Sequence, residues 1–260
     1  MSDRRIAAQW SALRRARRPA LIPYLTAGYP NRAATLDALN MVARRGADFV
    51  EVGVPFSDPL ADGPAIQYAS QVALEGGMTV AGTLDLIASA RLSIPVVLFS
   101  YLNPLLAYDL SKFVRDALAA GVAGVLVTDL PAGEDPATEA AIRGGGLDLI
   151  RLIAPTTTEH RLRHAVRDAD GFVYLISRLG VTGARTTVTA ALEDTVGRLR
   201  RVTELPIAVG FGMAGAEQAR AVARFADGVV VGSALMERLG KSLSAAEDLV
   251  RELRAALGDA

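Results

Sequence analysis

The feature that most constrains the fold of this chain is a regular alternation of short apolar runs with segments of helical periodicity. Eight runs rich in apolar and β-branched residues lie at 20–25, 48–54, 95–100, 123–128, 148–153, 171–177, 206–211 and 228–232. Between them lie segments rich in alanine, leucine and arginine, such as 35–45, 111–120 and 214–225. Many of these segments end near a glycine just before the next run, as at Gly46 and Gly121, which is typical of a helix C-terminus.

Strands that alternate with helices predict right-handed crossovers and a parallel sheet. Eight such units in about 250 residues match an α/β (β/α)8 TIM barrel. An open doubly wound sheet is the alternative, although it usually has fewer strands. Because no linker or change in composition divides the chain, we expect residues 1–260 to form a single barrel domain.

Additional helices are expected at both ends of this pattern. Ile6, Trp10 and Leu13 recur at helical spacing after Ser2, a plausible N-cap, which predicts a lead-in helix whose arginines face solvent. A short extra helix is expected after the last run, at 228–232.

The composition excludes several classes of protein. Acidic and basic side chains number 28 each, and this balance argues against binding to nucleic acid or to an anionic membrane. The chain has no cysteine, so it has neither disulfides nor thiolate chemistry. No apolar stretch is long enough for a signal peptide or a membrane span, and we expect a cytoplasmic protein.

An acid interrupts the second apolar run, in VEVGVPFSDPLADGP at 50–64. In a barrel, chemistry takes place at the carboxyl ends of the strands. Side chains alternate along a strand, so Glu51 points inward if Val50 and Val52 face the helices. Burial raises the pKa of a carboxyl toward neutrality, which suits proton transfer. A structural acid paired with an arginine is the alternative, and Arg151 is the inward-facing candidate.

Two further acids follow in the loop after this run. Asp58 stands in Ser-Asp-Pro, a frequent turn pattern. Asp62 precedes Gly63 and Pro64, where a helix can begin, so it could serve as a cap. Over the mouth of a barrel it would instead share proton transfer with Glu51, because carboxylates in different environments hold different pKa values.

Glycines that follow the last two runs predict a phosphate site. Residues 210–215 spell G-x-G-x-x-G, but the acid that would bind a ribose is missing, since Asp227 lies at the beginning of the next run. Barrels often bind phosphate in this region instead, using backbone N–H groups. Gly212, Gly232 and Ser233 can form such a site, and a packing role for the glycines is the alternative.

The segment 177–187 is rich in glycine and hydroxyl residues and predicts a mobile lid, which includes Arg178 and Thr182. Gly183 could add a backbone contact to phosphate.

Two kinds of chemistry are disfavoured. The two lysines of the chain, Lys112 and Lys241, lie in or after helical segments, which argues against a Schiff base in the barrel mouth. His160 and His164 have a spacing that can bind zinc, but no glutamate completes the motif. We expect these histidines on a solvated helix face and predict no metal site.

Five segments together resemble the tryptophan synthase alpha chain family: EVGVPFSDPLADGP at 51–64, PYLTAGYP at 23–30, SRLGVTGAR at 177–185, VGFGM at 209–213 and GSA at 232–234. They occur in the family's order and cover essentially the whole chain. The resemblance implies a carbon–carbon lyase of tryptophan biosynthesis, which cleaves indole-3-glycerol phosphate into indole and D-glyceraldehyde 3-phosphate by acid–base catalysis. No cofactor is expected in this chain, because the indole ring accepts electrons once its C3 is protonated.

The resemblance also implies roles for individual residues. Glu51 is the acid–base group, Asp62 is a second catalytic carboxylate near the indole N–H, and Tyr174 lies in the same pocket. Positions that bind the substrate phosphate match Gly183, Gly212, Gly232 and Ser233. Positions that line the indole pocket match Tyr24, Tyr101 and Phe211. Tyr24 stands where many relatives carry phenylalanine.

The resemblance further implies an α2β2 complex with a pyridoxal-phosphate-dependent beta chain, which receives the indole. The loops 55–62 and 103–108 would reach this partner, with Pro55 and Asp58 at the interface. Three alternatives remain: a stand-alone lyase that releases free indole, a non-catalytic allosteric partner of the beta chain, and a phosphosugar isomerase.

Overall fold

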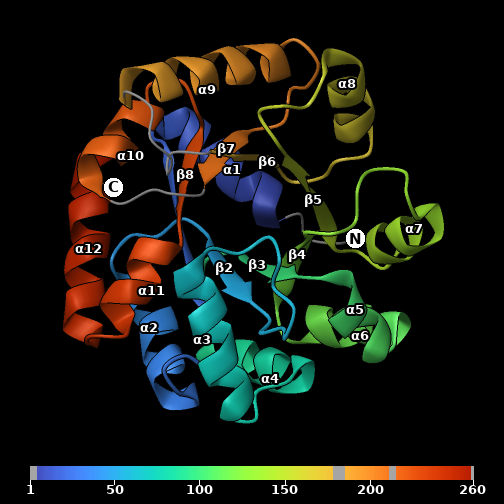
Figure 1. The fold of residues 1–260 in the computed structure, drawn as a ribbon, viewed down its shortest axis with the longest axis vertical. Coiled ribbons are helices and arrows are strands. Elements are labelled where there is room, and N and C mark those ends of the chain that lie inside the picture. Colours follow the sequence, from blue (N-terminus) through green and yellow to red (C-terminus); the bar gives the residue numbers. More distant parts are fainter. Residues whose placement is uncertain (1–4, 178–184, 211–214, 259–260) are drawn as a thin grey trace.

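The computed structural model of the chain describes residues 5–177, 185–210 and 215–258 (Figure 1). Eight parallel strands form a closed barrel in which each strand pairs with the next and β8 pairs with β1. The strands are β1 (Ala20–Thr26), β2 (Val50–Gly53), β3 (Val96–Ser100), β4 (Val122–Val127), β5 (Asp148–Ile153), β6 (Val173–Ile176), β7 (Ile207–Gly210) and β8 (Gly228–Val231). This topology confirms the predicted barrel and excludes the open sheet.

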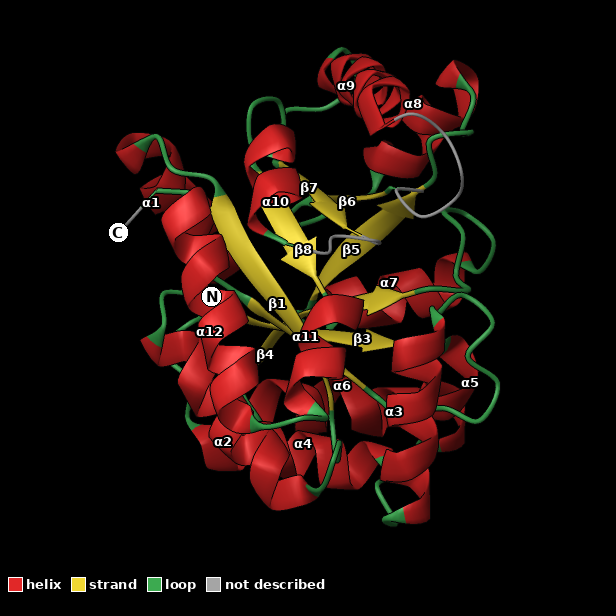
Figure 2. Ribbon diagram, turned by 60° about the vertical axis from the view of Figure 1, so that its left-hand side comes forward, coloured by secondary structure: helices red, strands yellow, loops and turns green. Residues whose placement is uncertain are grey.

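Helices cover the outside of the barrel (Figure 2). In the described residues they are α1 (Arg5–Ala16), α2 (Arg32–Arg44), α3 (Pro64–Glu75), α4 (Val80–Ala90), α5 (Leu102–Ala107), α6 (Leu110–Ala119), α7 (Pro136–Gly144), α8 (Glu159–Arg167), α9 (Arg185–Arg200), α10 (Ala216–Val222), α11 (Ser233–Leu239) and α12 (Leu243–Ala256). The extra helix expected after the last strand is α11. No helix in the described part of the chain has both the length and the apolar character needed to cross a bilayer.

Local signals explain where the predicted helices begin and end. Asn31 caps α2 by accepting a hydrogen bond from the N–H of Ala34 at 2.9 Å. Gly46 and Gly121, which follow α2 and α6, have φ values of +86° and +90°, a conformation that glycine adopts at little cost. The last of the predicted segments, 214–225, is helical only over Ala216–Val222 within the described residues.

Helix α1 closes the N-terminal end of the barrel. The Trp10 ring packs against Phe49 and Phe172, with ring centroids 4.8 and 5.7 Å apart. Glycines at the start of the strands make room for it, because a Cβ at Gly228 would lie 2.9 Å from Cη2 of Trp10. A Cβ at Gly124 would likewise lie 2.8 Å from Cδ1 of Ile6, another α1 residue. The predicted lead-in helix is therefore part of the core, while Ser2 lies outside the described residues.

The buried carboxylate of Asp48 holds several elements together at this same end. It lies just before β2, and its side chain is 3% exposed. It accepts hydrogen bonds from the N–H of Leu21 at 2.8 Å and from Nη1 of Arg254 at 3.0 Å, and it pairs with Arg18. One acid thus connects β1, β2 and the last helix, α12.

Replacing Asp48 by asparagine should lower the free energy of unfolding by about 3 kcal/mol, because two arginines lose their buried countercharge. The surface pair Arg32–Asp85 offers a matched control, since the Asp85 side chain is 72% exposed. Asp85→Asn should change stability by no more than about 0.5 kcal/mol. Urea unfolding monitored by circular dichroism measures both variants, and equal effects would contradict the role given to Asp48.

Candidate active site

Glu51 lies in the middle of β2 and is completely buried. Its partners in register are Tyr24 on β1 and Val97 on β3. Neither carboxylate oxygen has a hydrogen-bond partner among the described residues. Burial raises the pKa of Glu51 from 4.5 to about 8, because the charged form loses its hydration without gaining a partner. The side chain is therefore a neutral acid at pH 7.

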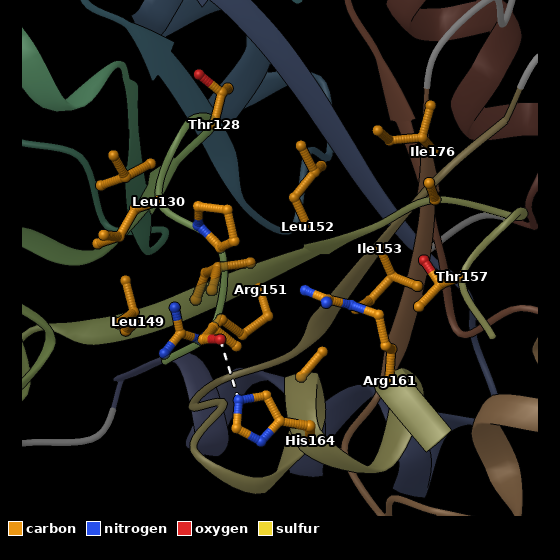
Figure 3. Close-up of a pocket in the computed structure, with 16 residues that line it drawn as sticks. Thr128, Leu130, Leu149, Arg151, Leu152, Ile153, Thr157, Arg161, His164 and Ile176 are labelled. Atoms are coloured by element: carbon orange, nitrogen blue, oxygen red, sulfur yellow. Dashed lines mark hydrogen bonds between the residues drawn. The ribbon is translucent and has the colours of Figure 1, made fainter. Parts of the chain in front are cut away.

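Arg151 does not serve as a partner for this acid. Its guanidinium forms a buried ion pair with Glu139 of α7, on the side of β5 that faces the helices. There it lines a cavity of about 260 Å³ between β5 and α8 (Figure 3). The expectation that Arg151 points into the barrel was therefore wrong. His164 lies beside the same cavity, with its Nε2 atom 3.1 Å from the carbonyl oxygen of Ala132.

Asp62 lies in the loop between β2 and α3, next to a tyrosine from the neighbouring strand. The Tyr101 hydroxyl accepts a hydrogen bond from the N–H of Ala61 at 2.9 Å and is hydrogen-bonded to the Asp62 carboxylate. Burial raises the pKa of Asp62 from 3.8 to about 6, and the bond to Tyr101 opposes this shift. Asp62 does not cap α3, because the N-cap is Gly63, without a side-chain bond.

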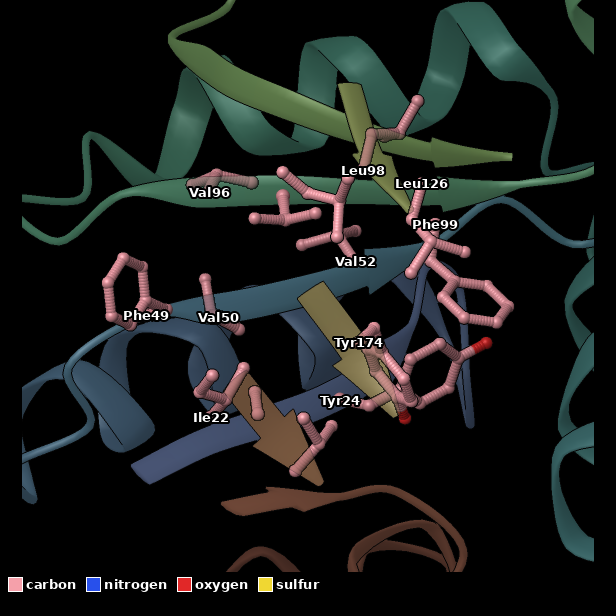
Figure 4. Packing of buried hydrophobic residues seen from close by; sticks show 14 of the residues in the cluster. Ile22, Tyr24, Phe49, Val50, Val52, Val96, Leu98, Phe99, Leu126 and Tyr174 are labelled. Atoms are coloured by element: carbon pink, nitrogen blue, oxygen red, sulfur yellow. The ribbon is translucent and has the colours of Figure 1, made fainter. Parts of the chain in front are cut away.

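Two tyrosines that line one pocket occupy equivalent places on two different pairs of neighbouring strands. Tyr24 lies over Gly53 at the end of β2, where a Cβ would be 2.5 Å from Cζ of the ring. Tyr174 on β6 lies over Gly210 at the end of β7 in the same way, also at 2.5 Å. Burial keeps both phenols neutral by raising their pKa. Figure 4 shows Tyr24, Tyr174 and Phe99 at one end of the core, far from Phe49.

A small pocket brings together five of the predicted site residues, Tyr24, Asp62, Tyr174, Gly232 and Ser233, whereas Glu51 and Tyr101 do not line it. It is lined by Tyr24, Asp62, Ile66, Phe99, Tyr174, Val230, Gly232 and Ser233. Sequence reasoning missed Ile66, Phe99 and Val230. Alternation along β3 could have identified Phe99, because it stands two residues before Tyr101 and therefore on the same face. Ile66 comes from the first turn of α3, which carries no such signal.

The remaining predicted residues fall into two groups. Arg178, Thr182, Gly183, Phe211 and Gly212, which were predicted to form the lid, part of the phosphate site and part of the indole pocket, lie outside the described residues. In the loop after β2, Asp58 is exposed and its carbonyl oxygen accepts a hydrogen bond from the N–H of Leu60 at 2.9 Å, as in a turn. Pro55 is buried, so its side chain shapes the loop from inside.

Glu51 does not line the pocket, but its carboxyl acts electrostatically on Tyr24 and Tyr174, which do. Together these groups can support acid–base chemistry near neutral pH. Glu51 holds a proton at pH 7 and can donate it, whereas Asp62 is mostly ionised and can stabilise a positive charge. The ring of Tyr24 contacts that of Phe99 edge to face at 5.4 Å, and the hydroxyl of Ser233 lies at the N-terminus of α11.

Comparisons with known proteins show which family and which solved structures the chain resembles. A family model described as tryptophan synthase alpha chain matches residues 10–259. The tryptophan synthase alpha chain of Acidiphilium cryptum is 47% identical over 244 residues, which cover 93% of this chain and 88% of the relative. That of Geobacter sulfurreducens is 45% identical, and the match covers 98% of this chain and 99% of the relative.

Solved structures of similar fold include tryptophan synthase from M. tuberculosis in an aminoacrylate-bound form. It has 37% sequence identity and a TM-score of 0.89, and the match covers 98% of this chain and 99% of that chain. Tryptophan synthase subunit alpha from Legionella pneumophila has 33% identity, a TM-score of 0.89 and coverage of 97% and 98%.

The raised pKa of Glu51 predicts that the fold loses stability as the pH rises from about 4.5 to about 8. In that window the folded chain binds a proton at Glu51 that the unfolded chain has released, so unfolding becomes easier by up to about 1.4 kcal/mol per pH unit. Glu51→Gln should remove this slope between about pH 6.5 and 8, where Asp62 is largely ionised in the folded chain as well, and should be the more stable protein at pH 8. Urea unfolding at pH 5, 6.5 and 8 measures how the free energy of unfolding depends on pH. The exposed Glu75→Gln should keep the wild-type slope, and an unchanged slope in Glu51→Gln would contradict the prediction.

Proposed function

This chain belongs to the tryptophan synthase alpha chain family, and we propose that Glu51 and Asp62 carry out the proton chemistry of the family's lyase reaction. The reaction cleaves indole-3-glycerol phosphate into indole and D-glyceraldehyde 3-phosphate and belongs to tryptophan biosynthesis. The observation that supports the proposal most directly is Glu51, a buried carboxyl that has no hydrogen-bond partner among the described residues. It acts electrostatically on Tyr24 and Tyr174, which line a pocket that contains a second carboxyl.

In the proposed mechanism Glu51 acts first as an acid. Its neutral carboxyl donates a proton to C3 of the indole, and the ring becomes an iminium-like electron acceptor. The Glu51 carboxylate then removes the proton of the side-chain hydroxyl next to the bond that breaks. The electrons of the carbon–carbon bond return to the ring, indole leaves, and the new carbonyl belongs to glyceraldehyde 3-phosphate. Glu51 ends protonated, as it began.

Asp62 stabilises the positive charge that this step creates. Its carboxylate, ionised above about pH 6, would accept a hydrogen bond from the indole N–H. The bonds of Tyr101 to Asp62 and to the N–H of Ala61 hold the carboxylate and its loop in place. Because the indole ring itself accepts the electrons, the proposal requires no cofactor in this chain.

The pocket also suggests how the substrate binds. The rings of Tyr24, Tyr101 and Tyr174, with Phe211, would contact the indole. The N–H groups of Gly232 and Ser233 would hold the phosphate together with Gly183 and Gly212. Arg178 and Thr182 would belong to a lid over the substrate. We propose that residues 1–260 carry all of these parts as one domain.

Replacing Glu51 by glutamine should abolish release of glyceraldehyde 3-phosphate, because an amide cannot exchange the proton. Substrate affinity should stay within about tenfold of wild type, or about 1.4 kcal/mol, since the amide keeps the size of the side chain. A coupled assay of glyceraldehyde 3-phosphate and isothermal titration with indole-3-glycerol phosphate measure the two quantities. Glu75→Gln should retain full activity, and substantial turnover by Glu51→Gln would remove Glu51 from its role.

We further propose that the loops after β2 and β3 bind a beta chain in an α2β2 complex, with pyridoxal phosphate in that partner. Leu60 is 92% exposed in the first loop. The segment 103–108, expected as a loop, is largely helix α5, where Leu106 is 49% exposed. These exposed apolar side chains are available for a contact with a partner. Asp58 lies beside Leu60 and can add a polar contact. Biosynthesis of this kind places the complex in the cytoplasm.

Replacing Leu60 by aspartate should weaken binding of the cognate beta chain by at least tenfold, because a charge would be buried in the contact. Leu118→Asp is the matched control, since Leu118 is 38% exposed near the end of α6, away from these loops, and should not affect binding. Biolayer interferometry measures the affinity, and an assay with and without the beta chain measures the rate of cleavage. Fast cleavage that the beta chain does not change would favour a stand-alone lyase.

A further inference from the structure

A cavity of about 290 Å³ lies at the N-terminal end of the barrel, between α1 and α10. Its polar lining comes from Trp10, Arg14, Arg17, Arg18 and Asp227. Two lining residues, Pro19 and Asp227, stand just before the strands β1 and β8. Ser233 of the proposed substrate site instead follows β8. The cavity and the proposed substrate site therefore lie at opposite ends of the barrel.

Two buried hydrogen-bond donors at this cavity have no acceptor among the described residues. The Trp10 side chain is 97% buried in the core that α1 shares with the strands, and its indole Nε1 has no partner there. Nη1 of Arg18 is in the same situation, although Nη2 of the same guanidinium pairs with Asp48. Buried donors are nearly always satisfied in folded proteins, so two such donors beside one cavity indicate an acceptor that fills it.

The charges around the cavity favour an anion. The Arg17 side chain has no ion pair or hydrogen bond among the described residues, where the residue bonds only through its backbone N–H. Arg14 donates to the carbonyl oxygen of Glu204 at 2.8 Å, which leaves its charge uncompensated. Asp227 is the acid in the lining, but its carboxylate already accepts from Arg200 and from the N–H of Ile207. The cavity therefore carries an excess of positive charge.

We propose that this cavity is a second anion site, which binds a small phosphate-bearing dianion through Arg17, Arg18 and the indole N–H of Trp10. The guanidinium group presents its donors in a planar fork that fits phosphate oxygens. The volume accommodates a phosphate and a few further atoms. Arginines near the N-terminus, which the sequence analysis placed on a solvated helix face, thus take part in binding a ligand.

Trp10 provides a direct reporter, because it is the single tryptophan among the 260 residues. Inorganic phosphate, added at constant ionic strength with potassium chloride, should change the fluorescence of the wild-type chain in a saturable manner. Arg17→Gln should raise the apparent dissociation constant at least fivefold. Arg15→Gln is the matched control, because Arg15 is an exposed residue of α1 outside the lining, and it should bind phosphate like the wild type.

Four results would overturn the proposal. They are a linear or absent response to phosphate, an equal response to chloride alone, equal affinities of Arg17→Gln and Arg15→Gln, and loss of the response in Ser233→Asp. The last result would mean that phosphate acts from the substrate site at the other end of the barrel, since the new carboxylate repels an anion only there.

Discussion

The chemistry of this barrel depends on one constraint: Glu51 is buried where no cation or hydrogen-bond donor of the described chain compensates its charge. A carboxyl in such a place keeps its proton well above its ordinary pKa. Closure of the barrel creates this environment, because strands on both sides of β2 shield the side chain from water. An open sheet edge would let water reach the group and would return it to an ordinary acid.

The space above Glu51 depends on two glycines and on the register of the strands. Tyr24 pairs in register with Glu51, and Gly53 stands two residues further along the same face of β2. Tyr174 pairs with Ala208, and Gly210 again stands two residues further along. In both cases the glycine has no side chain, which leaves room for the phenol ring of the tyrosine at the mouth of the barrel. The same register therefore gives the pocket two aromatic walls, to which Asp62 adds a carboxylate.

The sequence predicted the fold well because its signals are local and repeat eight times. The inward position of Glu51 follows from alternation along one strand. The direction of the Arg151 side chain was predicted wrongly because β5 is covered on both faces. Its run of mostly apolar residues therefore does not distinguish the face toward the barrel interior from the face toward the helices. The hydrogen bond between Tyr101 and Asp62 could not be predicted from the sequence for a different reason. It joins the end of β3 to a loop after β2, and only the three-dimensional path of that loop brings them together.

Asp48 and Glu51 show how the position of an acid along one run of residues separates a structural role from the proposed catalytic role. Both belong to the run DFVEVGV, and both are buried. Asp48 lies just before the strand, where Arg18, from the segment between α1 and β1, and Arg254 of α12 pair with it. Three residues later, at Glu51, the chain has entered the barrel, and no ion pair with an arginine is formed there within the described part of the chain. A charged pair at Glu51 would fix its proton state. Because no cation of residues 5–177, 185–210 or 215–258 pairs with it, the group remains able to exchange a proton.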